Sequence, residues 1–327
     1  MQIPTMTDVL AARTLVRRHL TPTPVRAYAG LDRASGAHVM VKHENVNPTS
    51  AFKVRGGLNL LGNLPVEECQ RGVVGYSTGN HAQSLAYAAR SYGVPCVIVM
   101  PASPNPTKAQ AVRDLGAELA EAGETFDECR TYAERVADER GMRLVSAANE
   151  MPIIAGVATA YLELIESVPD LDTIVVPVGS GSGAAAACLV TAALAPSCRV
   201  VAVQSAASPA AHDSWHSGEL LARANRTRVD GLATGAGFDL PQSILRDRLA
   251  DFVLVDDDQI RDAQRVMLHE AHTLAEGAGA AALAAVLAYG EPFRDQTVAV
   301  ICTGANASPA EIEAASIPAE MASSVHE

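Results

Sequence analysis

The chain has 327 residues, of which 48% are hydrophobic and 19% are charged, and its formal net charge is −12 at pH 7. This composition excludes disordered, collagen-like and low-complexity chains, so the sequence predicts a globular protein. The negative charge would repel phosphate backbones and anionic lipids, which argues against nucleic acid and membrane surfaces as partners.

From residue 73 onward, short β-branched segments alternate with helical ones, a pattern typical of βαβ units and a parallel sheet. The predicted strands cover residues 73–76, 96–100, 143–145, 173–178, 199–204, 252–255 and 297–301. The predicted helices cover residues 81–92, 107–115, 126–140, 153–166 and 182–194, and two more begin at residue 257 and after residue 277. Residues 206–241 show no clear period and form the longest irregular segment. The sequence therefore predicts an α/β fold.

The cysteines and the first residues indicate the cellular compartment. The six cysteines form no C-x-x-C pair and have no histidine at metal-ligand spacing, so we expect reduced thiols. Residues 1–10 lack the basic region and apolar run of a secretory signal, and we therefore expect a cytoplasmic protein. The most apolar stretches, residues 183–196 and 277–290, are shorter than the roughly 20 residues of a membrane helix and predict buried helices.

Four loops carry the candidate site, because α/β proteins bind small molecules where loops leave the carboxyl ends of strands. The most informative loop is Gly179-Ser180-Gly181-Ser182-Gly183, which leads directly into a predicted helix. Glycines permit close backbone approach, and the N–H groups at a helix start favour a phosphate. A tight turn without a ligand is the alternative interpretation.

The same loop also matches a dinucleotide fingerprint, through Gly179, Gly181 and Ala184. That fingerprint expects an acidic residue at the end of the next strand, where this chain has Gln204. The fingerprint also usually opens its domain, whereas this loop lies past the middle of the chain. A nicotinamide cofactor is therefore less favoured than another phosphate-bearing group.

Lys53 lies in the first turn of a predicted helix, within the segment Asn47-Pro48-Thr49-Ser50-Ala51-Phe52-Lys53-Val54-Arg55-Gly56-Gly57. An ordinary surface lysine is the simplest interpretation, although a cation at a helix start opposes the helix dipole. Lys53 follows Phe52 and precedes Val54, so desolvation and the helix start both favour its neutral form. A neutral amine is what Schiff-base chemistry requires.

The third loop, Ser77-Thr78-Gly79-Asn80-His81-Ala82-Gln83, again leads from a strand into a helix. Its hydroxyl and N–H groups suit a substrate carboxylate, whereas helix capping with His81 in the core is the structural alternative. The fourth loop, Cys302-Thr303-Gly304-Ala305-Asn306, is less informative. Cys302 has no base partner in sequence, and we expect a small core residue rather than a nucleophile.

Together and in this order, the four loops resemble those of the fold-type II pyridoxal-phosphate enzymes, especially serine/threonine dehydratases and serine racemase. The resemblance covers nearly the whole chain and extends to three further motifs, Thr21-Pro22-Thr23-Pro24, Val41-Lys42-His43-Glu44-Asn45 and Glu276-Gly277-Ala278-Gly279. It implies two open, twisted, mostly parallel sheets flanked by helices, as in the β subunit of tryptophan synthase. It also implies a large cofactor-binding domain over residues 1–65 and 150–327, a small substrate-binding domain over residues 66–149, and a homodimer.

The resemblance implies that pyridoxal 5′-phosphate is the cofactor and that Lys53 holds it covalently. Lys53 would then act as general base and acid at the α-carbon of the substrate. The other implied cofactor contacts are Phe52 on the ring, Asn80 at the phenolic oxygen, Gly179, Ser180, Gly181, Ser182 and Gly183 at the phosphate, and Thr303 beside the pyridine nitrogen.

On the substrate side, the resemblance implies that Ser77, Thr78 and His81 hold the carboxylate. Thr78 matches a serine that serine racemase places opposite the lysine, and it is therefore the second candidate catalytic residue. The usual serine before the aromatic residue is Ala51 here, which leaves the substrate open. Some relatives bind a divalent cation through acidic residues, but residues 204–210 contain none, so we expect no metal.

The implied activity is elimination of the β-hydroxyl from L-threonine or L-serine, which yields a 2-oxo acid and ammonia. The alternatives within the family are a dehydratase for a less common substrate, such as 3-hydroxyaspartate or a compound from hydroxyectoine breakdown, and a serine racemase. Outside the family, a nicotinamide-dependent oxidoreductase and a catalytically silent binding protein remain open.

Overall fold

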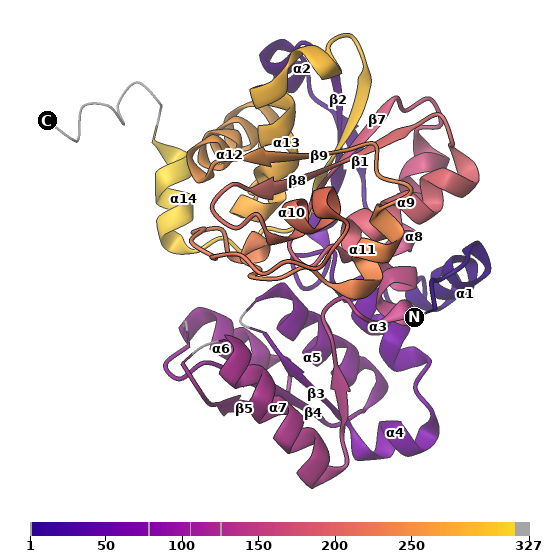
Figure 1. The fold of residues 1–327 in the computed structure, drawn as a ribbon, viewed down its shortest axis with the longest axis vertical. Coiled ribbons are helices and arrows are strands. Elements are labelled where there is room, and N and C mark those ends of the chain that lie inside the picture. Colours follow the sequence, from indigo (N-terminus) through magenta and orange to yellow (C-terminus); the bar gives the residue numbers. More distant parts are fainter. Residues whose placement is uncertain (1, 78, 105, 125, 318–327) are drawn as a thin grey trace, which may run out of the picture. The chain divides into compact units, whose positions relative to one another are not determined.

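The computed structural model describes residues 2–77, 79–104, 106–124 and 126–317, and the chain divides into two compact units (Figure 1). Unit 1 contains Pro22–Ala51 and the chain from Ala160 onward, whereas unit 2 contains Gln2–Thr21 and Phe52–Thr159. Helix α8 (Met151–Ser167) includes the division at Ala160. Each unit has its own sheet with helices packed around it, which confirms the predicted α/β fold.

Unit 1 is built on a six-stranded sheet with the strand order β1-β2-β10-β7-β8-β9. Its strands are β1 (Val25–Ala27), β2 (His38–His43), β7 (Thr173–Pro177), β8 (Arg199–Ser205), β9 (Asp251–Val255) and β10 (Thr297–Cys302). The β1–β2 pair is antiparallel and all other pairs in this sheet are parallel. The carboxyl ends of β7, β8 and β10 therefore meet at one edge of the sheet.

Helices cover both faces of this sheet (Figure 1). On one face, α2 (Ala29–Ser35), α12 (Asp257–Ala271) and α13 (Gly277–Tyr289) share an apolar core with valines of β2, β7, β8 and β10. On the other face, α9 (Ser182–Leu194) packs on β7 and β8, next to α11 (Asp239–Leu245). The alanine-rich segments at α9 and α13 are buried over most of their length, as the sequence predicts, whereas the last turn of each helix is exposed.

The predicted irregular segment contains short elements rather than a long loop. These are α10 (Ala210–Ser217), the 3-10 turn η2 (Asp230–Leu232) and the start of α11. Near the end of the described chain, α14 (Pro309–Ser316) packs on α12. Within the described ranges, no helix is long and apolar enough to cross a membrane.

Unit 2 has a four-stranded parallel sheet with the strand order β5-β4-β3-β6. The strands are β3 (Val73–Tyr76), β4 (Cys96–Met100), β5 (Glu118–Glu121) and β6 (Arg143–Val145). The helices are α1 (Met6–Val16), α3 (Val54–Gly62), α4 (Val66–Arg71), α5 (Asn80–Tyr92), α6 (Pro106–Asp114) and α7 (Phe126–Arg140). Strand β5 was not predicted, because it is an edge strand that begins and ends with exposed glutamates.

Candidate functional site

Lys53 immediately precedes α3 in unit 2 and is the N-cap residue of this helix. Its Nζ lies 5.2 Å from the centre of the Phe52 ring. Burial lowers the pKa of Lys53 to about 8, because desolvation disfavours the ammonium form. The amine that the sequence singles out as a nucleophile therefore has a substantial neutral fraction near neutral pH.

The backbone around Lys53 is held by close packing of α3 against α5. The Ser84 hydroxyl donates a hydrogen bond of 2.6 Å to the carbonyl oxygen of Lys53. A Cβ at Gly57 would lie 2.7 Å from the carbonyl oxygen of Ser84, so glycine is needed for this approach. The two glycines of the segment after Lys53 thus have a packing role, since Gly56 is in similarly close contact with Ile153.

The loop that joins β3 to α5 contains the residues predicted to bind the substrate. Thr78, the second predicted catalytic residue, lies outside the described residues. The Ser77 hydroxyl accepts a hydrogen bond of 3.2 Å from the N–H of Gly79. Asn80 is the first residue of α5, followed by buried His81. The described part of this loop thus presents a hydroxyl and a helix start, the groups on which the carboxylate prediction depends.

His81 is a neutral side chain in this site. Burial is the main cause that lowers its pKa to about 3, and the nearby charge of Lys53 acts in the same direction. The imidazole hydrogen-bonds to the backbone of Val145, whereas its Nε2 has no hydrogen-bond partner among the described residues. A backbone carbonyl only accepts hydrogen bonds, so the nitrogen that faces Val145 carries the proton and Nε2 is an acceptor. This atom suits a hydroxyl or ammonium donor better than a carboxylate.

In unit 1, the loop from Gly179 to Gly183 connects β7 to the start of α9. Gly181 adopts a left-handed conformation with φ of 91° and is the N-cap of α9, with no side-chain capping hydrogen bond. A Cβ at Gly179 would clash with the carbonyl oxygen of Gly231, and one at Gly181 would lie 2.9 Å from Pro241. Glycine is therefore needed at both positions, and the helix start retains the arrangement that favours an anion.

The loop after β10 lies in the same unit and contains Thr303, which is buried. Gly304 forms an antiparallel bridge with Ala51, and the Asn306 amide donates a hydrogen bond of 2.9 Å to the carbonyl oxygen of Thr49. The structure therefore brings the Thr303 loop next to the segment that leads into Lys53, although the two are about 250 residues apart in sequence.

The start of α13 supports the same loop. The N–H of Glu276 donates a hydrogen bond of 3.0 Å to the carbonyl oxygen of Gly304. A Cβ at Gly279 would clash with that same oxygen, which explains why the predicted motif contains glycine there. Cys302 is fully buried and burial raises the pKa of its thiol, so it is a core residue and not a nucleophile.

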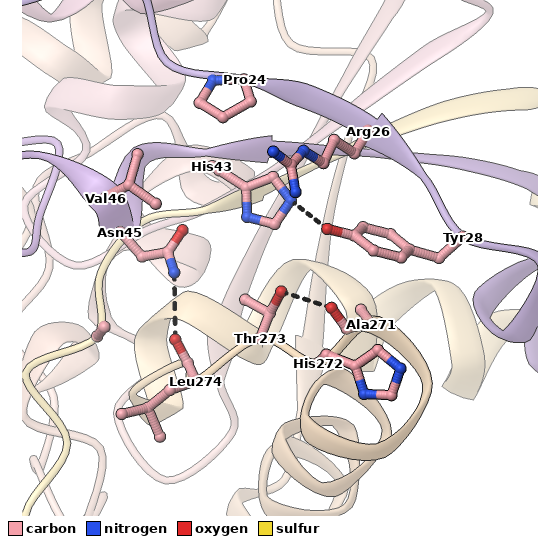
Figure 2. Close-up of a pocket in the computed structure, with 11 residues that line it drawn as sticks. Pro24, Arg26, Tyr28, His43, Asn45, Val46, Ala271, His272, Thr273 and Leu274 are labelled. Atoms are coloured by element: carbon pink, nitrogen blue, oxygen red, sulfur yellow. Dashed lines mark hydrogen bonds between the residues drawn. The ribbon is translucent and has the colours of Figure 1, made fainter.

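Unit 1 also contains a pocket of about 390 Å³ that the sequence did not predict (Figure 2). The Tyr28 hydroxyl and His43 Nε2 are 2.9 Å apart, and the Asn45 amide donates a hydrogen bond of 3.2 Å to the carbonyl oxygen of Leu274. The lining residues are Pro24, Arg26, Tyr28, His43, Asn45, Val46, Ala271, His272, Thr273, Leu274 and Ala305. They come from segments far apart in the chain, so no single local motif predicts the pocket.

Comparison with known proteins places these features in context. Residues 16–304 match the family described as pyridoxal-phosphate dependent enzyme. The chain is 34% identical over 307 residues to a β-hydroxyaspartate dehydratase of Paracoccus denitrificans, which covers 94% of this chain and 97% of the relative. It is also 34% identical over 307 residues to an L-threonine ammonia-lyase of Thermotoga maritima, covering 92% of this chain and 75% of the relative. The structure of maize serine racemase matches with a TM-score of 0.91 at 27% identity, covering 100% of both chains.

Proposed function

This chain belongs to the family of pyridoxal-phosphate dependent enzymes, and from that premise we propose that it is an ammonia-lyase for a small hydroxy-amino acid such as L-threonine or L-serine. Pyridoxal 5′-phosphate is its cofactor. The observation that carries the proposal is the position of Lys53 at the start of α3, with its amine 5.2 Å from the centre of the Phe52 ring. Burial lowers the pKa of this amine to about 8, which leaves it partly neutral under physiological conditions. A nicotinamide cofactor has no comparable support, since Gln204 stands where a ribose-binding carboxylate would be required.

The residues present fit this cofactor. Lys53 would hold it through its amine, and Phe52 would offer an apolar face to its ring. The glycine loop before α9 supplies a tight turn and a helix start for its phosphate. The remaining assignments are Asn80 at the phenolic oxygen, Thr303 at the pyridine nitrogen, and Ser180 and Ser182 as hydroxyl donors of the phosphate loop.

When bound, the cofactor withdraws the charge that develops at the α-carbon of the substrate. Lys53 Nζ would take the α-proton, for which it must be neutral. Passing that proton on to the departing β-hydroxyl would let the hydroxyl leave as water and return Lys53 to its neutral form. The unsaturated product then takes up one water and releases ammonia as it becomes the 2-oxo acid. The water lost and the water taken up cancel, so the net reaction is loss of ammonia without overall oxidation or reduction. No further oxidant or reductant is required.

Thr303 influences which reaction follows removal of the α-proton. A carboxylate at this position would stabilise a proton on the pyridine nitrogen, whereas the neutral Thr303 hydroxyl does not. Charge withdrawal from the α-carbon is then moderate. Direct loss of the β-hydroxyl therefore competes well with reactions in which that charge must persist.

The substrate side rests on the loop between β3 and α5. We assign the carboxylate to Ser77, Thr78 and the N–H groups at the start of α5. The Nε2 acceptor of His81 suits the amino or hydroxyl group of the substrate, which refines the role that the sequence predicts for this residue.

A dehydratase for 3-hydroxyaspartate is the second candidate, because the Paracoccus relative that bears this activity in its name spans almost the whole chain. Serine racemase is the third candidate, supported by the maize structure. A panel of L-threonine, L-serine and both 3-hydroxyaspartate diastereomers, assayed for 2-oxo acid and ammonia, distinguishes the two lyase candidates. D-serine measured by chiral chromatography in the same reactions tests the racemase. Lys53→Ala is the control for enzyme-independent release. If the cofactor-saturated protein forms no 2-oxo acid from any of these compounds, the lyase proposal is wrong.

A homodimer, which the family resemblance implies, and a cytoplasmic location are part of the same proposal. Light scattering of the purified protein tests the dimer, and cell fractionation tests the location. The domain bounds that the sequence predicts, with residues 66–149 as the substrate domain, stay a prediction.

A further inference from the structure

Gln204, near the end of β8, is fully buried and connects three segments of unit 1. Its Oε1 accepts a hydrogen bond of 3.0 Å from the N–H of His212 on α10. Its Nε2 lies 3.4 Å from the hydroxyl oxygen of Thr234. That hydroxyl in turn lies 3.1 Å from the carbonyl oxygen of Gly179. A continuous chain of hydrogen bonds thus runs from α10 to the first residue of the glycine loop.

The direction of each hydrogen bond in this chain follows from its chemistry. The Gly179 carbonyl only accepts, so the Thr234 hydroxyl uses its single proton there. The Thr234 oxygen then accepts from the Gln204 amide nitrogen, while the Gln204 amide oxygen accepts from the N–H of His212. A glutamate at position 204 would have no N–H to donate and would compete for the Thr234 proton.

Two hydrogen bonds hold the backbone of Thr234 in place. Its N–H donates a hydrogen bond of 2.9 Å to the carbonyl oxygen of Leu232, and its carbonyl oxygen accepts one of 2.9 Å from the Ser208 hydroxyl. The neighbouring Gly231 lies so close to Gly179 that a Cβ on Gly179 would clash with it. The segment around η2 therefore packs closely against the glycine loop.

The hydroxyl of Thr234 determines how the first peptide of that loop is oriented. In a trans peptide the carbonyl and the N–H point in opposite directions, so holding the Gly179 carbonyl also sets the direction of the Ser180 N–H. Gly179 has no side chain to restrict its backbone dihedrals, so without this hydrogen bond the peptide could rotate more readily. We propose that Gln204 and Thr234 are positioning residues that hold the loop in the conformation that binds the cofactor phosphate. This inference rests on the phosphate-binding role given to the loop under the proposed function.

The test compares Thr234→Val with Thr191→Val in full-length apoprotein titrated with pyridoxal 5′-phosphate. Thr191 is a matched control, because its buried hydroxyl donates a hydrogen bond of 2.9 Å to the Ala187 carbonyl within α9. We expect Thr234→Val to weaken cofactor binding about threefold to tenfold, the range for loss of one hydrogen bond. Thr191→Val should leave the Kd unchanged, although both variants lose similar thermal stability. Thr234→Ser keeps the hydroxyl and should restore the Kd.

A second measurement detects the loop directly. The phosphorus NMR shift of bound cofactor should change in Thr234→Val and in Gln204→Glu, but not in Thr191→Val. Gln204→Glu also serves as the independent variant if Thr234→Val does not fold. If both positioning variants bind the cofactor with the Kd and the phosphorus shift of the wild type, the inference is overturned. A change confined to the KM of the amino acid overturns it as well. Failure of the wild-type protein to bind the cofactor at all would instead overturn the proposed function.

Discussion

The fraction of Lys53 in the neutral form should govern how fast the apoenzyme captures its cofactor. At a pKa of about 8, about one-tenth of the amine is neutral at pH 7, because each unit below the pKa reduces the neutral form about tenfold. At the ordinary lysine value of 10.5, the neutral fraction at pH 7 would be about one in 3000. Burial thus increases the reactive fraction about 300-fold. Since the pKa is lowered, the capture rate should rise with pH and level off above about 9.

This prediction is tested by mixing apoenzyme with pyridoxal 5′-phosphate between pH 6 and 10 and following the absorbance change by stopped flow. The same reaction with N-acetyl-lysine corrects for ionisation of the cofactor itself. Lys53→Ala should abolish capture, whereas Lys108→Ala, which changes a lysine on α6, should behave like the wild type. A corrected rate that still increases tenfold per pH unit above pH 9 would show that Lys53 has an ordinary pKa. Undiminished capture by Lys53→Ala would show that another group reacts.

Two further predictions concern the metal and the stereochemistry. EDTA should leave the lyase activity unchanged, because residues 204–210 have no carboxylate and the described residues hold no cluster of three metal-ligating side chains. A large loss of activity that magnesium reverses would contradict this prediction. With L-serine, pyruvate should form faster than D-serine. Racemisation needs a second acid on the cofactor face opposite Lys53, and the β-branch of Thr78 restricts rotation of the side chain that would have to serve. Thr78→Ser should therefore increase the share of D-serine. Chiral chromatography measures both products, and equal rates in the unmodified enzyme would identify a racemase.

Much of the fold could be predicted because its central strands are buried on both faces. Strands such as β4 and β7 consist of continuous apolar, mostly β-branched residues, a pattern that local sequence reveals. Strand β5 has the sequence ELAE, and its stability comes from parallel pairing with β4 rather than from its own pattern. The short helices between residues 206 and 241 escaped prediction for the same reason, since tertiary contacts determine them.

In the candidate site too, some parts could be predicted from local sequence and others could not. The glycine loop, Lys53 and the Thr303 loop could be predicted because their chemistry depends on consecutive residues. The link from Gln204 through Thr234 to Gly179 joins residues that are about 30 to 55 positions apart, within and beside a segment without period. In the sequence, Gln204 is notable only because it stands where a carboxylate was sought, whereas in the structure both the oxygen and the nitrogen of its amide form hydrogen bonds.

Lys42 provides a test of what holds unit 1 together. Its Nζ lies 2.8 Å from Glu163 and 3.8 Å from Glu44, and it donates a hydrogen bond of 3.0 Å to the carbonyl oxygen of Thr23. All three charged side chains are buried, so Lys42→Met removes the cation that both carboxylates contact in a medium of low polarity. We expect the free energy of unfolding to fall by about 3–5 kcal/mol.

The matched control for Lys42→Met is Arg33→Met. Arg33 pairs with Glu270 at 3.2 Å, but the two side chains are 72% and 42% exposed, so this change should cost less than about 1 kcal/mol. Urea denaturation of the apoprotein measures both variants. Adding Glu163→Gln to Lys42→Met should recover part of the loss, because it neutralises one of the two carboxylates left behind. Equal small losses in both single variants, with no recovery in the double variant, would mean that Lys42 does not compensate a buried negative charge.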